Sequence, residues 1–329
     1  MTINTKQSET TQTPELRTAW MLNDGKIGDV VQCRAIAQSL GIDAQHRVVA
    51  PRAPWVWFSP WGPVDPKDAP GAPGSALCEP FPDLIIASGR RAAPYARLVK
   101  KQSGYATRIV MLKDPRIGRV AFDLIWTPDH DEVSGENIFS TLTAPHGLRA
   151  RLHVSRNNTD SPLRGAARPL LGVLLGGVTR NVSFDVSFAR RLAQTIDKAG
   201  RDFQSVIIIP SRRTPRPILD FFSSFSFSAP VILSDEVDIP YVDLLAYADS
   251  LIVTGDSHNL VSEAVSTGAS VYTIRPPGLP TKMHGFLDGL EVLNAVRPLA
   301  DHARPFDVNS IDVTDEIAAE IRKRVFGQT

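Results

Sequence analysis

The sequence predicts an α/β protein made of two Rossmann-like, doubly wound domains. From residue 18 onward a short apolar run, a turn with glycine or aspartate, and an amphipathic helix follow one another repeatedly. The same order restarts near residue 170, after a polar stretch. The 329 residues, 43% of them hydrophobic, suffice for two cores. We therefore expect two parallel sheets with helices on both faces.

Five strands are predicted in the first half, each from a short apolar run. They cover residues 19–22, 47–49, 84–87, 108–112 and 123–126, and the clearest helices cover 30–40 and 92–102. Residues 51–82 are crowded with Pro, Gly and Trp, which cannot continue a helix or a central strand. We expect an irregular loop there, with its tryptophans either over a cleft or tucked into the core.

Five further strands and four helices are predicted in the second half. The strands cover 170–175, 205–209, 230–233, 250–254 and 270–274, and the helices 184–199, 215–222, 242–248 and 260–267. A last helical pattern at 313–325 could reach back to the first domain. The predicted parts are a disordered tail (1–15), an N-terminal domain (16–155), a linker (156–168), a C-terminal domain (169–310) and a C-terminal helix (311–329).

Charge and apolar content exclude several classes of protein. With 36 basic and 35 acidic residues the net charge is +1, so no overall field attracts nucleic acid or an anionic bilayer. No apolar run approaches the roughly 20 residues of a membrane-spanning helix, and no basic amphipathic helix is evident. Residues 1–15 match neither a secretory signal nor a transit peptide. Cys33 and Cys78 lack ligand spacing and are expected to be reduced and buried, as in the cytoplasm.

Charged and polar residues gather in the turns after the predicted strands of the first half. Ligands of open α/β sheets bind at the carboxyl ends of the strands, so these turns are the candidates for chemistry. The first turn is not a P-loop, because no glycine stands five residues before its Gly-Lys pair. A capped turn with solvated charges is the alternative. The candidates are Asp24, Lys26, Gly28, Asp29, Gln32, Gly89, Arg90, Arg91, Asp114, Arg116, His130 and Asp131.

Two of these clusters indicate a kind of ligand. Arg90 and Arg91 stand at a predicted helix start, where the helix dipole disfavours cations, so an anionic ligand explains them better. Asp129 and Asp131 form an Asp-x-Asp triplet around His130, which could bind Mg²⁺ beside a diphosphate. The triplet fits a helix cap or a general base as well, and we expect no metal cofactor.

Small and polar residues follow the first two strands of the second half. Gly176 and Gly177 would let backbone N–H groups contact a phosphate. The next turn places two arginines before Pro215, with a Ser or Thr expected to cap the helix that follows and the arginines expected to meet an anion. Its candidates are Ser211, Arg212, Arg213 and Thr214.

The turn after strand 250–254 opens a helix with an acidic residue near its start. Glu263 can accept two hydrogen bonds from a ribose diol, and Ser257 can face a diphosphate. Helix capping by Asp256 and Ser257 is the alternative. The candidates in this segment are Asp256, Ser257, Asn259, Ser262 and Glu263.

Taken in order, these motifs resemble the mitochondrial-fission "elongated mitochondria" family, in its bacterial branch. The resemblance covers residues 20–286 and is carried by Asp24-Gly25-Lys26 with Gln32, Gly89-Arg90-Arg91, Asp114-Pro115-Arg116, His130-Asp131, 211–215 and 254–264. It implies a glycosyltransferase of the B type. Such an enzyme has two facing Rossmann-like domains, the donor nucleotide sugar in the C-terminal one, the acceptor in the N-terminal one, and no required metal.

The resemblance also implies residue roles. Donor binding falls to Ser211, Arg212, Arg213 and Glu263, and acceptor-side or catalytic roles fall to Asp24, Lys26, Arg90 and His130. The family pattern more often has histidine at the position of Asp29, so the general base stays open between Asp24, Asp29 and the His130-Asp131 pair. The basic and aromatic side chains of 282–286 would stand before a closing helix.

We predict a glycosyltransferase that uses a nucleoside-diphosphate sugar as co-substrate and needs no other cofactor. Its acceptor stays open, with lipid-linked acceptors and cell-envelope glycans as candidates. Two other classes compete: a non-catalytic fission-type scaffold that keeps the fold, and a nucleotide-sugar epimerase or hydrolase. The expected location is the cytoplasm or the inner face of the membrane. A dehydrogenase is disfavoured because no G-x-G-x-x-G follows a predicted strand.

Overall fold

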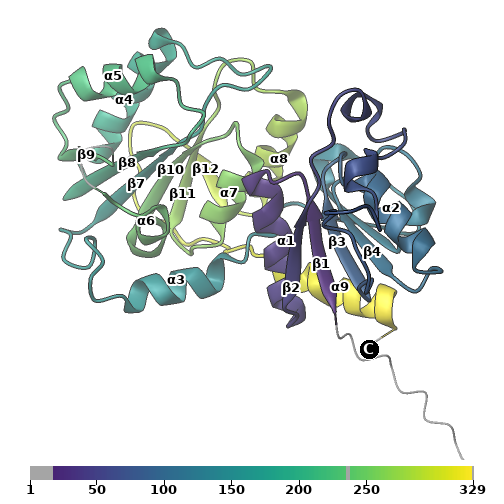
Figure 1. Ribbon diagram of the computed structural model, residues 1–329. Helices are drawn as coiled ribbons and strands as arrows, with labels where there is room; N and C mark the ends of the chain where they lie inside the picture. The colour runs from purple at the N-terminus through teal and green to yellow at the C-terminus, as the bar shows by residue number, and fades with distance from the viewer. Residues whose placement is uncertain (1–17, 235–237, 328–329) are drawn as a thin grey trace, which may run out of the picture. The chain divides into compact units, whose positions relative to one another are not determined.

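The chain divides into two compact α/β units, each built on one six-stranded sheet (Figure 1). The computed structural model describes residues 18–234 and 238–327, so the predicted tail at 1–15 lies outside the described residues. Unit 1 contains the chain up to Trp126, Ser134–Phe139 and the chain from Asp315 on; unit 2 contains Thr127–Val133 and Ser140–Thr314. The predicted α/β class with two Rossmann-like domains is confirmed, and the exact domain limits stay predictions.

The sheet of unit 1 has the strand order β2-β1-β3-β4-β5-β6, and its central strand pairs are parallel. The five predicted strands are present, and a sixth, β6, was missed because it has only four residues, two of them Ser and Thr. Strands β1, β3 and β5 are buried along their whole length, as parallel strands covered on both faces must be. The strands are β1 (Ala19–Asn23), β2 (Ala44–Val48), β3 (Leu84–Ser88), β4 (Arg108–Leu112), β5 (Leu124–Pro128) and β6 (Ile138–Thr141).

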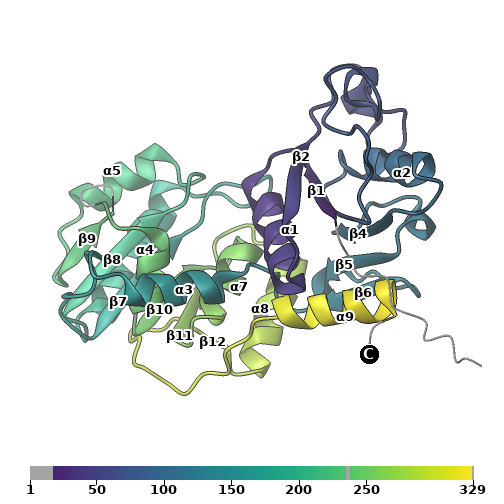
Figure 2. The ribbon, with the colours of Figure 1, turned by 60° about the horizontal axis from the view of Figure 1, so that its bottom comes forward.

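Within the described residues, three α-helices belong to unit 1: α1 (Ile27–Leu40), α2 (Ala93–Gln102) and, from Asp315 on, α9 (Thr314–Phe326). The C-terminal α9 lies beside α1 (Figure 2), where Arg322 donates a hydrogen bond to the Ser39 carbonyl. Arg324 also donates to the carbonyl of Ile138 in β6. These contacts hold α9 against α1 and β6.

The Pro-rich segment 51–82 forms two short 3-10 helices, η1 (Trp55–Phe58) and η2 (Pro66–Asp68), within otherwise irregular chain. Trp57 and Trp61 are 73% and 65% exposed, so the alternative that places tryptophans in the core is wrong for these two. The prediction of two buried thiols was half wrong, because Cys33 is buried and Cys78 is exposed, both as free cysteines. Because Cys33 lies in the core beside Asp29, burial first and then the carboxylate raise its thiol pKa to about 12.

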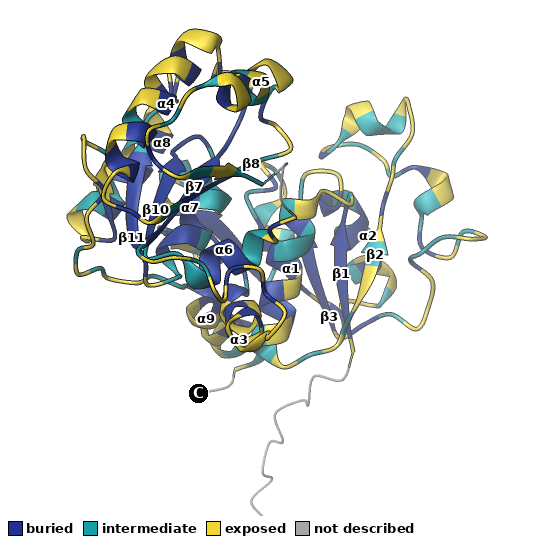
Figure 3. Cartoon of the chain, turned by 90° about the vertical axis from the view of Figure 1, so that its left-hand side faces the viewer, coloured by how far each residue is buried: buried dark blue, intermediate teal, exposed yellow. Residues whose placement is uncertain are grey.

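The sheet of unit 2 has the order β12-β11-β10-β7-β8-β9, and all its strand pairs are parallel. Figure 3 shows its central strands as buried ribbon, covered by helices with exposed outer faces. The strands are β7 (Leu170–Leu175), β8 (Ser205–Pro210), β9 (Val231–Leu233), β10 (Ser250–Thr254), β11 (Ser270–Ile274) and β12 (Val296–Pro298). The helices are α3 (Leu148–Asn157), α4 (Val186–Gly200), α5 (Arg216–Ser224), α6 (Tyr241–Tyr247), α7 (His258–Val265) and α8 (Thr281–Val292).

Three elements of unit 2 were not predicted, each for a local reason. Helix α3 is rich in arginine and starts at Gly147 without a capping side chain. Helix α8 contains Gly285 and Gly289, and glycine disfavours a helix by about 1 kcal/mol relative to alanine. Strand β12 has only three residues and ends in Pro298. The sheet of unit 2 therefore has six strands where five were predicted. Residues 282–286 therefore lie inside a helix and not before one.

Candidate functional site

The predicted residues gather at the point in each sheet where the strand order reverses. In unit 1 the chain runs from β1 to β2 on one side and returns to β3 on the other. In unit 2 it runs from β7 through β8 to β9 and returns to β10 on the other side of β7. Adjacent turns diverge at such a switch point and leave a crevice at the carboxyl ends of the strands, where open α/β sheets bind ligands.

Asp256 joins the three turns at the switch point of unit 2. Its carboxylate accepts hydrogen bonds from the Gly177 N–H at 3.1 Å, the Thr254 hydroxyl at 2.8 Å and the Arg213 guanidinium at 3.1 Å. Thr254 Oγ1 in turn accepts from the Gly176 N–H at 2.7 Å. The Asp256 side chain is fully buried, so these bonds supply the stabilisation that its charge loses by leaving water.

Glycine is required at both positions after β7. A Cβ on Gly176 would lie 2.0 Å from Asp256 Oδ1, and a Cβ on Gly177 would lie 2.1 Å from the Arg213 carbonyl oxygen. Both N–H groups already donate within the protein. The two glycines therefore admit the close approach of neighbouring turns, and an anion bound here must be held by other groups.

The turn after β8 presents its arginines outward and its hydroxyls inward. Ser211 and Thr214 both donate to the Gly176 carbonyl, so neither caps the next helix as predicted. Helix α5 instead follows Pro215 without a capping side chain. Arg212 and Arg213 are exposed, and Arg213 makes one ion pair, to Asp256. This turn thus holds two cations beside the switch point.

Helix α7 starts at the end of β10 with its predicted hydroxyl cap. Ser257 accepts a hydrogen bond from the Leu260 N–H at 3.4 Å, whereas Asp256 does not cap the helix. Asn259 lies in its first turn and is half-buried. Ser262 is fully buried and accepts from the Ala144 N–H at 3.0 Å, which makes it a packing residue in this structure.

Glu263 forms a half-buried hydrogen-bonded pair with Tyr241, a residue that the sequence did not indicate. The Tyr241 hydroxyl of α6 donates to Glu263 Oε2 at 2.5 Å. Burial raises the pKa of Glu263, and the tyrosine hydrogen bond offsets part of that rise. Burial and the Glu263 charge together raise the pKa of Tyr241 well above its usual range. A carboxylate has about four acceptor positions, so this pair still leaves capacity for a bound hydroxyl.

Asp29 occupies the centre of the switch point in unit 1. Its Oδ1 accepts from the Ser88 hydroxyl at 2.8 Å and pairs with the Lys113 ammonium at 2.5 Å, across 84 residues of sequence. Lys113 has a φ of 78°, a left-handed conformation that is costly for a residue with a Cβ. The structure thus maintains a strained lysine against a buried carboxylate, although neither Lys113 nor Ser88 was among the predicted residues.

Asp24 lies in the first turn of unit 1, and only one of its two carboxylate oxygens has a partner. Its Oδ2 is 2.6 Å from the Lys26 ammonium and 3.5 Å from the Arg91 guanidinium. Its Oδ1 is buried and has no hydrogen-bond partner. Gly89, with a φ of 89°, turns the chain beside this cluster, and Arg90 is exposed there. Gly28 lies in the first turn of α1, and Gln32 is buried one turn later.

Asp114 and Arg116 form a separate structural loop. Arg119 binds Asp114 with two hydrogen bonds of 2.9 and 2.8 Å, and the Arg116 N–H donates to the same carboxylate. These bonds hold the pKa of Asp114 below its usual range. The Asp114 carboxylate is therefore already occupied by Arg119, and the Arg116 side chain is exposed.

His130 packs among residues of unit 2. Its ring lies 4.7 Å from the ring of His258 and 5.8 Å from Phe286, and its Nδ1 is buried without a partner. The Asp131 carboxylate is 3.8 Å from Nε2 and also binds Lys282 of α8 at 3.0 Å. His258 contacts the Leu142 carbonyl through Nε2 at 3.0 Å. The sequence could not reveal the contact between His130 and His258, because these residues stand 128 positions apart.

Acid should destabilise the protein through its buried histidines. Burial lowers the pKa of His130 and of His146, so the unfolded chain binds protons that the folded protein does not. Stability is therefore complete above the unfolded value of about 6.5 and falls as the pH drops below it. Urea unfolding at about pH 7.5 and about pH 5.5 measures the loss, and a His130→Gln/His146→Gln variant should show a flatter dependence. An unchanged slope in this variant would contradict the assignment.

Among the described residues, no group of three or more His, Cys, Asp and Glu side chains is arranged to hold a metal ion. Within the same part of the chain, no helix combines the length and the apolarity needed to cross a bilayer.

The fold and the two switch points define a class of protein. The chain has the fold of B-type glycosyltransferases and UDP-N-acetylglucosamine 2-epimerases, with two Rossmann-like domains. It belongs to the Mitochondrial fission ELM1 family, whose model matches residues 27–325. The family resemblance seen in the sequence motifs is thereby confirmed.

Two relatives support the family membership. The mitochondrial fission protein ELM1 of Arabidopsis thaliana is 24% identical over 273 residues, covering 74% of this chain and 64% of that protein. The uncharacterised protein RP120 of Rickettsia prowazekii is 26% identical over 239 residues, covering 62% of this chain and 67% of that protein. The chain thus spans slightly less than two thirds of the Arabidopsis protein.

Solved structures share the fold at low sequence identity. A putative UDP-N-acetylglucosamine 2-epimerase from Listeria monocytogenes has a TM-score of 0.55 at 10% identity, covering 95% of this chain and 98% of that chain. The enzyme from Neisseria meningitidis, bound to UDP-GlcNAc, has a TM-score of 0.52 at 12% identity, covering 93% and 91%. The glycotransferase of kitacinnamycin has a TM-score of 0.51 at 11% identity, covering 95% and 90%.

Proposed function

We propose that this protein is a glycosyltransferase that binds a nucleoside-diphosphate sugar in unit 2 and transfers the sugar to an acceptor. The observation that carries the proposal is the switch point of unit 2. There Asp256 holds the turns after β7, β8 and β10 together while Arg212 and Arg213 stand exposed. The Neisseria structure of the same fold contains a UDP-sugar. The proposed site of action is the cytoplasm.

In the proposed complex, charge holds the diphosphate. Arg212 supplies one cation, Arg213 adds a second whose charge is partly offset by its pair with Asp256, and the start of α7 adds the positive end of a helix dipole. Glu263 would accept hydrogen bonds from the ribose diol, with Tyr241 fixing its orientation. When the sugar departs, the same cations stabilise the negative charge that develops on the diphosphate.

The residues of unit 1 would serve the acceptor. Asp24, Lys26 and Arg91 form one charged cluster, built by the turns after β1 and β3. Asp29 lies at the same edge of the sheet, bound to Ser88 and Lys113. We propose Asp24 as the general base, because its Oδ1 is buried and has no partner, whereas Asp29 is bound by Ser88 and Lys113. The His130-Asp131 pair, which belongs to unit 2, is the second candidate for the base.

Thermal unfolding with UDP, GDP, CMP and ADP tests donor binding. A nucleotide at about 100 times its dissociation constant should add roughly 2.7 kcal/mol to the stability of the protein. Arg212→Ala and Glu263→Ala should remove most of this gain. Arg190→Ala, which replaces an exposed arginine of α4, is the matched control and should keep it. If no nucleotide stabilises the wild-type protein, the donor site is refuted and the scaffold function becomes the better explanation.

A nucleotide-sugar epimerase or hydrolase is the second candidate, because the two 2-epimerase structures share the fold. Such a reaction needs no acceptor. Incubation of the protein with the nucleotide sugar alone therefore separates the two: an epimerised sugar nucleotide or a free sugar formed at full rate would replace the transferase proposal.

A further inference from the structure

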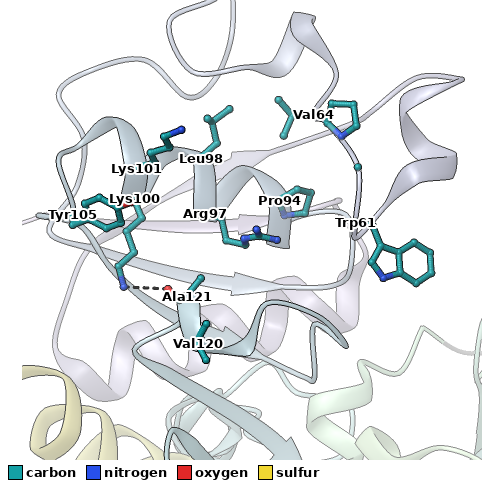
Figure 4. A pocket seen from close by; sticks show the side chains of 12 residues that line it. Trp61, Val64, Pro94, Arg97, Leu98, Lys100, Lys101, Tyr105, Val120 and Ala121 are labelled. Atoms are coloured by element: carbon teal, nitrogen blue, oxygen red, sulfur yellow. Dashed lines mark hydrogen bonds between the residues drawn. The ribbon is translucent and has the colours of Figure 1, made fainter.

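An apolar surface with basic residues on unit 1 has no role in the proposed transfer reaction. A cavity of about 610 Å³ lies between the segment after η1, helix α2 and the chain before Phe122 (Figure 4). Its walls include Trp61, Val64, Leu98 and Tyr105. No candidate catalytic or nucleotide-binding residue contributes to it.

The exposed aromatic side chains of the described chain gather here. They are four, Trp57, Phe58, Trp61 and Tyr105, with exposed fractions of 73%, 48%, 65% and 67%. Trp61 and Tyr105 line the cavity. Phe58 lies against the cavity wall, because a Cβ on Gly62 would be 2.1 Å from Phe58 Cβ, and Trp57 precedes Phe58 in η1. Val120, at 97% exposure, adds a fifth apolar group at the rim.

The charge of this surface is positive. Three basic residues line the cavity and no acidic residue does. Lys100 is neutralised by Asp123 at 2.7 Å, whereas Arg97 and Lys101 have no ion pair among the residues the structure describes. Figure 4 shows the Arg97 guanidinium directed into the hollow and Lys101 beside Leu98 on α2. Two unpaired cations beside exposed aromatic rings favour a partner that is anionic and apolar at once.

A phospholipid bilayer combines these properties. Tryptophan and tyrosine prefer the headgroup level, because their rings are apolar and their N–H and O–H groups stay hydrated. Each Lys or Arg near an anionic bilayer contributes through attraction to lipid phosphate. We propose that this surface of unit 1 docks onto membranes rich in anionic phospholipid. The proposal is independent of the sugar-transfer function. The sequence did not indicate this membrane contact, because it contains no evident basic amphipathic helix.

Vesicle flotation tests the docking. The full-length protein should float with vesicles made of equal parts phosphatidylglycerol and phosphatidylcholine and should stay behind with vesicles of phosphatidylcholine alone. Replacing Arg97 and Lys101 together by glutamate should weaken binding to the anionic vesicles by about twentyfold or more. Reversal of Arg190 and Lys198 in unit 2 changes the net charge equally and should leave binding intact.

A second set of variants in the same flotation experiment tests the aromatic residues. Trp57→Ala/Trp61→Ala should weaken vesicle binding by about tenfold, and Trp57→Tyr/Trp61→Tyr should restore most of it. Val292→Ala, at an 85% exposed site on α8, is the control for loss of an exposed apolar group. Nucleotide-induced stabilisation, measured on the same variants, should be unchanged, which separates this proposal from the proposed function.

Two outcomes would overturn the proposal. One is the absence of wild-type binding to the anionic vesicles, or binding that the surface variants leave unaltered. The other is tight binding to soluble polyglutamate, lost in the Arg97/Lys101 variant, without any binding to vesicles. The second result would assign the surface to an acidic protein partner.

Discussion

Replacing Asp256 by alanine should destabilise unit 2 by about 2–4 kcal/mol, because two buried donors lose their acceptor at about 1–3 kcal/mol each. The variant loses the acceptor of the Gly177 N–H and the Thr254 hydroxyl, and it leaves Arg213 unpaired. The three turns at the switch point then lose their common anchor, so nucleotide-induced stabilisation should disappear as well. Urea unfolding followed by circular dichroism measures the first effect and thermal shift the second.

Matched variants separate burial from charge. Asp256→Asn keeps the shape of the side chain and should lose less stability than Asp256→Ala. Asp202→Ala removes a carboxylate that is 41% exposed and paired at the surface, which should cost less than about 1 kcal/mol. A cost for Asp256→Ala no larger than that for Asp202→Ala would show that Asp256 does not anchor the turns.

Replacing Asp24 by asparagine should lower the turnover number of the proposed transferase by about a hundredfold to ten-thousandfold, the usual contribution of a general base. Asparagine keeps the size of the side chain and removes its ability to take a proton. The measurement is release of nucleoside diphosphate from the donor sugar that stabilises the protein. Donor affinity should be unchanged, because Asp24 belongs to unit 1 and the proposed donor site to unit 2.

Asp29→Asn and His130→Gln are the comparisons for this experiment. Asp29 is bound by Ser88 and Lys113, so its replacement should disturb the position of Lys113 and change turnover less than that of Asp24. If the large loss follows His130→Gln and not Asp24→Asn, the His130-Asp131 pair takes over as the base. A normal turnover number in all three variants would exclude these residues as the general base.

The secondary structure that the sequence predicted was the part with a strong local signal. Continuous apolar runs such as 84–87 and 170–175 became strands buried on both faces, because a parallel sheet covered by helices admits few polar side chains. The elements that escaped prediction lack such a signal. Strand β12 has three residues, and helix α8 contains two glycines whose preference is overridden by the packing of Met283, Phe286 and Leu290 in the core.

The candidate site was predictable in its location and not in its bonding. The sequence predicted that functional residues lie in the turns after the strands. In the structure, Asp24, Asp29 and Arg91 lie at one switch point, and Gly176, Arg213 and Asp256 lie at the other. Ser211 and Thr214, expected to cap a helix, bind the Gly176 carbonyl. Local spacing could not show this, because the partner turn lies on the preceding strand.

By itself the sequence determined the α/β class, the position of most strands and the turns that carry the polar residues, because these depend on interactions between neighbours along the chain. Only the tertiary structure decided which side chains meet. Lys113 reaches Asp29 across 84 positions, Gly177 reaches Asp256 across 79 and Tyr241 reaches Glu263 across 22. Each pairing depends on the order of strands in a sheet. That order follows from the packing of the whole core and cannot be read from the periodicity of the sequence.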